Sequence, residues 1–293
     1  MHRNTRKGWN IPCPAGEVPC SRLVFQGRNY QVGTFRCSAA HPRWQRTNYV
    51  LGWGSVLFPR VPVRIEPHAG GGGVVDPGRV IVVEDNETYE RTCLDPAGDQ
   101  SEWFAVSPEL LTAVLPGFEP GDFHKGRLPR RFSVTAREYA LQRRTLRHVL
   151  VAVEPDELLI EETVCGVLEG LRRSRARAGS GRCRSIVDRL QELLAARFRE
   201  PLGLTDLAGE LGVSAPHLCR VFREESGATI HDHREKLRFA AALDAFERGE
   251  RDLTTLALDL GYSSHAHFTA NFTQSLGQAP SRLRAAIQEG LLA

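Results

Sequence analysis

Cys37 and His41 stand four residues apart in the segment FRCSAAHPRW, a spacing at which a thiolate and an imidazole can bind one transition-metal ion. Cys13, Cys20 and Cys93 are the nearest candidates for further ligands. The chain has no C-x-x-C pair, however, and no tight cluster of histidines. The pattern therefore favours ordinary buried or surface cysteines and no cofactor. A metal- or thiol-responsive site at Cys37, His41 and Cys93 is the alternative.

A second group of residues combines aromatic rings with arginines in the same part of the chain. Trp44, Trp53 and Trp103, together with the alternating Arg60 and Arg64, could line a pocket for a small apolar or anionic effector. The other interpretation is that the rings belong to a hydrophobic core and the arginines to the surface, which is the more common arrangement.

The motifs of common enzyme classes are missing from the sequence. It contains no G-x-S-x-G, P-loop, H-E-x-x-H or glycine-rich dinucleotide motif. The glycines at 70–73 are followed by Val-Val-Asp rather than by a helix, which indicates a loop. We therefore expect this protein not to be an enzyme.

Two near-copies of one short sequence motif occur in the C-terminal third of the chain. GVSAPHLCRVF begins at Gly212, and GYSSHAHFTANF begins at Gly261. Each follows a short amphipathic segment that a glycine can end, because glycine tolerates the left-handed backbone conformation. Each then continues into a longer segment with helical spacing of its apolar residues. A helix, a glycine-containing turn and a second helix form a helix-turn-helix, so the sequence predicts two of them.

Caps and spacing complete the two predicted modules. We expect Thr205 to cap the first short helix, and Ser214 and Ser264 to cap the two longer helices. The matching residues are 49 apart before the turns and 50 apart after them, so the second turn is one residue longer. Between the modules, HDHREKLRFAAALDAFERG predicts a helix of about twenty residues that can hold them at a fixed separation.

The C-terminal third resembles the DNA-binding domain of the AraC/XylS family of transcription regulators. The resemblance rests on LTDLAGELGVSAPHLCRVFREESG, EKLRFAAAL and LTTLALDLGYSSHAHFTANFTQSLGQAPSRLR, and it covers roughly residues 186–287. It implies a transcription regulator that binds double-stranded DNA and acts with RNA polymerase. It also implies a cupin-like sensing domain in front that binds a small effector. The alternative is a DNA-binding protein without a ligand that is controlled by a protein partner.

The side chains expected to contact DNA lie on the outer sides of the two longer helices. Arg220 is the strongest candidate, because a guanidinium can pair with O6 and N7 of guanine. The resemblance supports it, since the family often carries arginine there. Ala270 stands at the matching position of the second module, so we expect weaker or more shape-dependent recognition there. The expected contact residues are Ser214, Ala215, Pro216, Cys219, Arg220, Ser264, His265, Ala266, Thr269 and Asn271.

The chain divides by pattern into five parts, and its predicted fold class is α+β. Short alternating apolar runs broken by Gly and Pro predict an antiparallel β-barrel. The two helical segments that follow, the first capped by Ser133, could pack on their own domain or pair with a second copy of the chain in a homodimer. The parts are an N-terminal arm (1–19), the cupin-like barrel (20–132), the helical connector (133–173), a basic flexible linker (174–185) and the all-α tandem helix-turn-helix domain (186–293).

Composition and charge set the remaining expectations. At 293 residues with 41% hydrophobic content, the chain can form two domains with real cores. No apolar run approaches the roughly 18 residues of a membrane helix, and MHRNTRKGWNIPC has no apolar core of a signal peptide. An odd number of cysteines, seven, is typical of a reduced cytoplasmic protein.

The charge is too mild to identify a polyanionic partner by itself. The formal net charge is +3 for the whole chain. Residues 184–293 carry thirteen Lys and Arg against fifteen Asp and Glu. Any affinity for phosphates must therefore come from the placement of charges rather than from their total.

Overall fold

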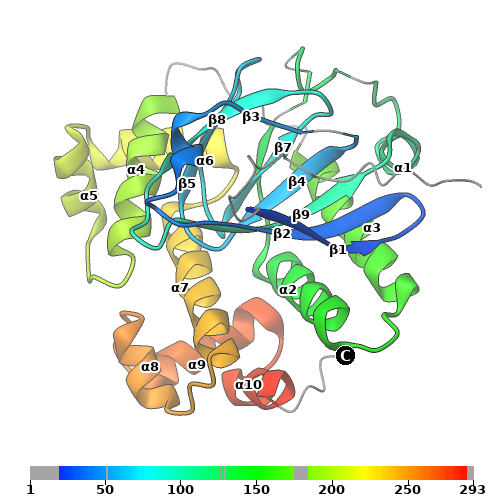
Figure 1. Ribbon diagram of the computed structural model, residues 1–293. Helices are drawn as coiled ribbons and strands as arrows, with labels where there is room; N and C mark the ends of the chain where they lie inside the picture. Colours follow the sequence, from blue (N-terminus) through cyan, green and yellow to red (C-terminus); the bar gives the residue numbers. More distant parts are fainter. Residues whose placement is uncertain are drawn as a thin grey trace, which may run out of the picture. The chain divides into compact units, whose positions relative to one another are not determined.

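Two antiparallel sheets form most of the N-terminal half in the computed structural model, which describes residues 20–50, 52–119, 121–125, 127–128, 130–174 and 184–288 (Figure 1). The strands are β1 (Ser21–Gln26), β2 (Tyr30–Cys37), β3 (Asn48–Tyr49), β4 (Gly54–Pro59), β5 (Val63–Pro67), β6 (Gly73–Val75), β7 (Arg79–Val83), β8 (Thr88–Cys93), β9 (Asp99–Val106) and β10 (Arg131–Ser133). A short 3-10 helix, η1 (Pro42–Gln45), lies between β2 and β3. One sheet has the order β1-β2-β9-β4-β7-β10, and the other has the order β3-β8-β5-β6.

The hydrophobic core of the N-terminal half is built from side chains at every second strand position. In β8, Tyr89 and Arg91 are buried, whereas Thr88 and Glu90 are exposed. Buried side chains of both sheets, Trp103 among them, form one cluster. Each large apolar side chain buried in this way stabilises the fold by about 1.5–3 kcal/mol. The predicted antiparallel β domain is confirmed, although its sheets do not close into one hydrogen-bonded ring within the described strands.

The rest of the described chain is mainly helical. The helices are α1 (Pro108–Val114), α2 (Ala136–Val151), α3 (Glu157–Ser174), α4 (Arg184–Arg197), α5 (Leu204–Leu211), α6 (Ala215–Ser226), α7 (Ile230–Glu247), α8 (Leu253–Asp259), α9 (His265–Leu276) and α10 (Pro280–Gln288). The chain forms two units: Met1–Phe132 with Glu157–Ala178, and Ser133–Asp156 with Gly179–Ala293. The sheets and α3 belong to the first unit, and α2 belongs to the helical unit. No helix in the described ranges has the length and apolar character needed to cross a bilayer.

A buried arginine attaches α2 to the helical unit. Arg143 of α2 is 3% exposed, and it pairs with Asp244 at 2.7 Å and with Glu247. Its guanidinium also donates to the Tyr139 hydroxyl at 3.2 Å. Both acidic residues belong to α7, so α2 packs along α7, and it also contacts α9. The basic linker predicted after α3 lies largely outside the described residues.

Two of the predicted helix caps are wrong. Thr135, not Ser133, caps α2: its hydroxyl accepts the Glu138 N–H at 3.2 Å, and the Glu138 carboxylate accepts the Thr135 N–H at 2.7 Å. This reciprocal pair satisfies two backbone donors, which a lone serine cannot do. Ser133 instead ends β10 and donates its hydroxyl to the Ser226 carbonyl.

The cap of the first short helix lies two residues before the predicted Thr205. Gly203 occupies the cap position, and its N–H donates to the Asp206 carboxylate at 2.8 Å. Thr205 lies inside α5. A carboxylate that reaches back to the backbone thus replaces the side-chain cap.

Candidate nucleic-acid interface

The first helix-turn-helix consists of α5 and α6, joined by a tight turn. Gly212 ends α5 in the left-handed conformation, with φ of 69°. The Val213 N–H then donates to the Ala208 carbonyl at 3.0 Å, and α6 starts after Ser214. Leu218 and Phe222 of α6 are fully buried against α4 and α5. The predicted first module is confirmed.

The second helix-turn-helix, α8 and α9, repeats the backbone hydrogen bond that closes the turn of the first. Gly261 has φ of 82°, and the Tyr262 N–H donates to the Ala257 carbonyl at 3.0 Å. One more residue, Ser263, then precedes Ser264, which caps α9. The second turn is therefore longer by the one residue that the spacing predicted.

Two arginines 50 residues apart confirm that the modules are equivalent. Arg234 donates to the Leu202 carbonyl at 2.7 Å, two residues before α5 begins. Arg284 donates to the Arg251 carbonyl, two residues before α8 begins. Each arginine thus fastens the helix after its module to the segment that enters the module.

Helix α7 contributes to the core of both modules. Its buried His233 meets Phe222 of the first module edge-on, with ring centroids 5.4 Å apart. Further along α7, Phe239 and Phe246 contact Phe272 of the second module at 5.1 and 6.0 Å. In Figure 1, α7 runs from the first module to the second. One continuous helix therefore connects the two recognition helices, α6 and α9.

A junction centred on Arg238 connects the second turn directly to the first module. Arg238 of α7 is 5% exposed and donates to the Phe198 carbonyl at 3.1 Å, just after α4. It pairs with Glu235 at 3.0 Å and lies 4.9 Å above the Tyr262 ring. The Tyr262 hydroxyl donates to Glu235 at 2.9 Å. Burial and the neighbouring Glu235 carboxylate raise the pKa of Tyr262, so the phenol keeps the proton that it donates.

Gly261 belongs to the same junction and packs closely against the backbone that follows α4. A Cβ at Gly261 would lie 2.1 Å from the Arg199 carbonyl oxygen, so only glycine allows this approach without a backbone shift. No comparable contact exists at Gly212, where a Cβ would have no neighbour within 4 Å. The second turn is therefore held against the end of α4, and the two modules have a fixed relative position.

Most of the predicted contact residues of α6 are exposed. Pro216, Cys219 and Arg220 face solvent, and Ala215 is half-buried. The Arg220 side chain is 62% exposed, lies 3.7 Å from Glu224 and is 3.0 Å from the His217 ring. Exposed ion pairs of this kind contribute little stability, so the Arg220 guanidinium can exchange them for a base or phosphate. The sequence interpretation missed His217, which the i, i+3 spacing to Arg220 could have indicated.

The predicted contact residues of α9 divide into two groups. Ser264, His265 and Ala266 are exposed at the start of the helix. Thr269 and Asn271 are half-buried, and their Oγ1 and Nδ2 atoms are shielded from solvent. Ala270, in the position that matches Arg220, is exposed. The start of α9 is therefore the part that can present polar groups to DNA.

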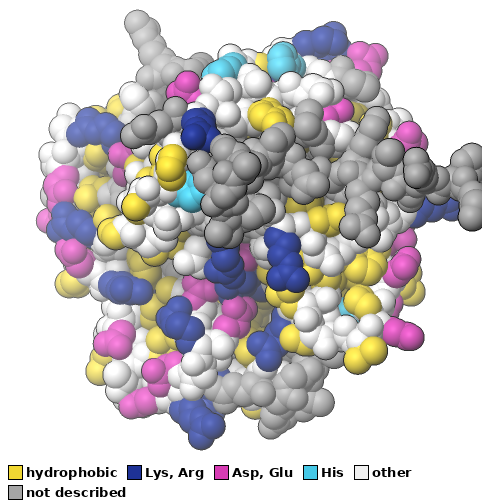
Figure 2. Space-filling view, viewed as in Figure 1, with side chains coloured by type: hydrophobic (Ala, Val, Ile, Leu, Met, Phe, Trp, Pro, Cys, Tyr) yellow, Lys and Arg dark blue, Asp and Glu magenta, His cyan; other side chains and the backbone are white. Residues whose placement is uncertain are grey.

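The two helix starts also offer partial positive charge. The Ser264 hydroxyl accepts the His267 N–H at 3.1 Å, whereas Ser214 forms no side-chain cap bond. Free N–H groups and the helix dipole favour a phosphate at such a position. Figure 2 shows Lys and Arg side chains interspersed with Asp and Glu on the face in view. Phosphate binding by this domain therefore depends on where individual charges lie rather than on the net charge.

Of the five residues predicted to line an effector pocket, the three tryptophans lie in or against one hydrophobic cluster. Trp103 is fully buried in the core between the sheets, and Trp44 and Trp53 pack against that core. Arg60 pairs with Glu102, which neighbours Trp103 in β9 and so points to the opposite face of the sheet. Arg64 pairs with Glu66 at 3.3 Å, and both residues are half-buried.

A charged pair that the sequence interpretation missed lies between the two sheets instead. Arg91 and Asp99 form an ion pair in which both side chains are almost completely buried. Burial raises the pKa of Asp99, while Arg91 and a hydrogen bond from Ser101 act in the opposite direction. The Arg91 guanidinium lies 3.9 Å above the Phe35 ring, and its Nε and Nη1 have no hydrogen-bond partner among the described residues. It can therefore donate to an anion.

The predicted metal or thiol residues are partly brought together. Cys37 and His41 lie close to each other, and Cys20 joins them. Cys93 lies apart from that group, and its thiol donates to the Asp95 carbonyl at 3.1 Å. Cys13 lies outside the described residues. Cys20 lies directly before β1, the strand that pairs with the Cys37 strand β2.

Comparison with known proteins gives a match for the C-terminal domain. Residues 207–286 match the family model of a helix-turn-helix domain. The HTH-type transcriptional regulator GlxA of Rhizobium meliloti (strain 1021) is 32% identical over 93 residues, which cover 32% of this chain and 29% of GlxA. The HTH-type transcriptional activator RhaR of Escherichia coli O139:H28 is 25% identical over 144 residues, which cover 49% of this chain and 51% of RhaR. The chain therefore spans only about a third to a half of the length of these relatives.

Two solved structures match this chain at a low level of similarity. An AraC-type transcriptional regulator from Chromobacterium violaceum is 25% identical over 35% of this chain and 92% of that chain, with a TM-score of 0.33. ToxT from Vibrio cholerae is 12% identical over 88% of this chain and 98% of that chain, with a TM-score of 0.34. TM-scores this low give no basis for transferring a function.

Proposed function

We propose that this chain is a sequence-specific DNA-binding transcription regulator of the AraC/XylS type, because residues 207–286 match the family model of a helix-turn-helix domain and the similar proteins GlxA and RhaR are transcription regulators. Its helices α6 and α9 enter neighbouring major-groove segments on one face of the duplex. The observation that carries this proposal is the junction at Arg238, which ties two equivalent modules together. Successive turns of one DNA face lie about 34 Å apart. Helix α7, with 18 residues, spans about 27 Å, so one chain can reach both segments.

The two recognition helices contribute differently to binding. Arg220 supplies base readout for α6, and the exposed Pro216 and Cys219 supply apolar contact with a thymine methyl group. Helix α9 acts through Ser264 and His265 at its start, with phosphate contacts and groove shape in place of an arginine. Binding by the second module is therefore weaker and less dependent on sequence.

Replacing Arg220 by alanine is expected to weaken binding to the preferred DNA by about 1–3 kcal/mol, which is roughly a 5- to 150-fold rise in Kd. The reason is the loss of one bidentate pair to a guanine. Base preference is expected to relax at one position of the site only. Fluorescence anisotropy on the preferred site and its single-base variants measures both effects.

Arg189→Ala is the control for this change, because it removes the same charge from an exposed position of α4. It is expected to leave base preference as it is. If Arg220→Ala and Arg189→Ala weaken binding equally at all sequences, then Arg220 acts by charge alone and does not read a base.

The N-terminal unit binds a small anionic effector in this proposal. The support is the buried guanidinium of Arg91, whose Nε and Nη1 can donate to a carboxylate. A buried ion pair adds little stability by itself, which is consistent with a binding role for this one.

A small carboxylate that binds here is expected to stabilise the N-terminal unit by about 2.7 kcal/mol at 100 times its Kd. Tryptophan fluorescence during thermal unfolding reports this unit, because all four tryptophans precede residue 104. Arg91→Lys keeps the charge but loses the planar fork, and it is expected to remove the stabilisation. A screen of small carboxylates in which none shifts the midpoint would rule out this effector class.

RNA polymerase and a second copy of the chain complete the proposed set of partners. Leu150 and Val151 at the end of α2 are at least half exposed, which provides an apolar surface for a homodimer contact through α2. Sedimentation of the whole chain and of Leu150→Glu tests the dimer: the wild type alone is expected to associate.

A further inference from the structure

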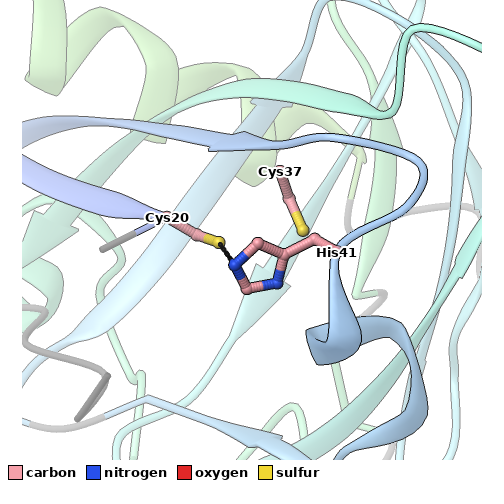
Figure 3. A group of neighbouring side chains, drawn as sticks. All are labelled: Cys20, Cys37 and His41. Atoms are coloured by element: carbon pink, nitrogen blue, oxygen red, sulfur yellow. Dashed lines mark hydrogen bonds between the residues drawn. The ribbon is translucent and has the colours of Figure 1, made fainter. Parts of the chain in front are cut away.

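Three side chains capable of binding a metal converge at one end of the β1–β2 hairpin. The sulfur atoms of Cys20 and Cys37 and one ring nitrogen of His41 all lie within 4.8 Å of one another. Figure 3 shows the Cys20 thiol and the Cys37 side chain directed toward the His41 ring. Both cysteines are buried, and neither is part of a disulfide.

The spacing of these atoms fits a tetrahedral site. Zn²⁺ binds sulfur at about 2.3 Å and imidazole nitrogen at about 2.0–2.1 Å, so a tetrahedral sulfur–nitrogen edge measures about 3.6 Å. The Cys20 sulfur lies 3.6 Å from Nε2 of His41. The protein therefore already holds this ligand pair at the separation that the metal requires.

Well-ordered secondary structure sets the position of each ligand. Ser21 pairs with Phe35 across β1 and β2, and the Arg36 N–H donates to the Cys20 carbonyl at 2.7 Å. Cys20, directly before β1, is therefore held beside Cys37 at the end of β2. His41 follows in a turn in which its N–H donates to the Ser38 carbonyl at 3.0 Å. The Trp44 indole donates to the same carbonyl at 2.7 Å. The ligands are therefore preorganised by β pairing and by one turn.

The ligand atoms of Cys20, Cys37 and His41 determine which metal ions can bind. Two sulfurs and one imidazole are soft and borderline ligands, which suit Zn²⁺ and do not suit Mg²⁺ or Ca²⁺. His41 is only half-buried, which leaves a path from solvent to the site.

We propose that Cys20, Cys37 and His41 bind one Zn²⁺ ion in the N-terminal unit, with the fourth position taken by an exchangeable ligand. Three protein ligands and one open position distinguish this site from a closed four-ligand structural site. The other group of metal-binding side chains found in the described residues, Glu84, Glu87 and His124, is already used by Arg130, which pairs with Glu87 at 2.6 Å.

Metal content of the whole chain tests this proposal without any DNA. The tag-free protein is reduced, loaded with zinc and dialysed, and zinc is then measured by mass spectrometry. One zinc per chain is expected. His41→Ala, a change at a half-buried turn position, is expected to raise the Kd for zinc by more than the roughly 10- to 100-fold typical of an outer-shell partner. Cys37→Ser is expected to abolish retention, whereas Cys93→Ser is expected to keep one zinc.

Cobalt provides a second measurement that does not depend on how a variant folds. Co²⁺ added to the wild-type chain is expected to give the intense visible bands of a tetrahedral site and a near-ultraviolet band from sulfur ligation. Three results would overturn the proposal: no retained zinc in the wild type, equal zinc in Cys37→Ser, or a Cys20–Cys37 disulfide that forms in place of metal binding. Because no step involves DNA, failure here would leave the DNA-binding proposal intact.

Discussion

Gly261→Ala is expected to destabilise the helical unit by about 2–5 kcal/mol, which is more than the same change at Gly212. At both positions alanine must adopt a left-handed backbone, at a cost of about 1–2 kcal/mol. Only at Gly261 does the new methyl group meet a backbone atom, the Arg199 carbonyl oxygen at 2.1 Å. Overpacking of this kind adds about 1–3 kcal/mol.

Gly212→Ala is the matched control, because it changes the equivalent turn of the first module. Denaturant unfolding of the whole chain separates the units: far-ultraviolet circular dichroism follows mainly the helical unit, and tryptophan fluorescence follows the N-terminal unit. The dichroism transition is expected to shift in both variants, and further in Gly261→Ala. Equal shifts would mean that the second turn is not held against the end of α4.

Arg238→Met is expected to destabilise the helical unit by about 3 kcal/mol, the lower end of the range for breaking a buried ion pair. The Phe198 carbonyl loses its donor, and Glu235 loses its cation. The expected loss of stability stays at the lower end of that range because the Glu235 side chain is 15% exposed and still accepts a hydrogen bond from the Tyr262 hydroxyl. Specific DNA binding is expected to fall as well, because α9 is no longer fixed relative to α6.

Arg248→Met is the control for this second change. Arg248 caps the same helix, α7, in an exposed position, so its loss is expected to cost less than about 0.5 kcal/mol. Arg238→Lys keeps the charge but loses the planar guanidinium. Its loss of stability is expected to lie between those of Arg238→Met and Arg248→Met. If Arg238→Met leaves both unfolding and DNA binding unchanged, the junction is not what fixes the modules.

The helical domain was predictable because its signals are local. Glycines at 212 and 261 and serines at 214 and 264 stand within a few residues of the turns that they form. The one-residue difference between the turns follows from the two spacings, and the structure places it at Ser263. The two capping errors have the same physical basis: a glutamate or aspartate three residues on can satisfy backbone donors that a nearby hydroxyl does not reach.

The contacts between distant segments could not be predicted in this way. Arg238 lies 40 residues from Phe198 in sequence, and nothing in either segment indicates that they meet. Cys20 and Cys37 come together only because β1 and β2 pair in one register. In the β domain, composition indicated strands correctly, but it did not indicate which arginine points inward. Arg60 and Arg64 pair with glutamates, whereas Arg91 is buried with Asp99 between the sheets.

A selection of genome fragments by the purified whole chain, followed by sequencing of the bound DNA, tests whether α6 and α9 read adjacent DNA segments. One asymmetric site is expected, with two blocks about one helical turn apart and a stronger base preference in the block that α6 contacts. Selection with Arg220→Ala is expected to weaken that block and leave the other unchanged. A single block, or a palindrome of two equal half-sites, would contradict the account, because the two modules of one chain would then not read adjacent segments together.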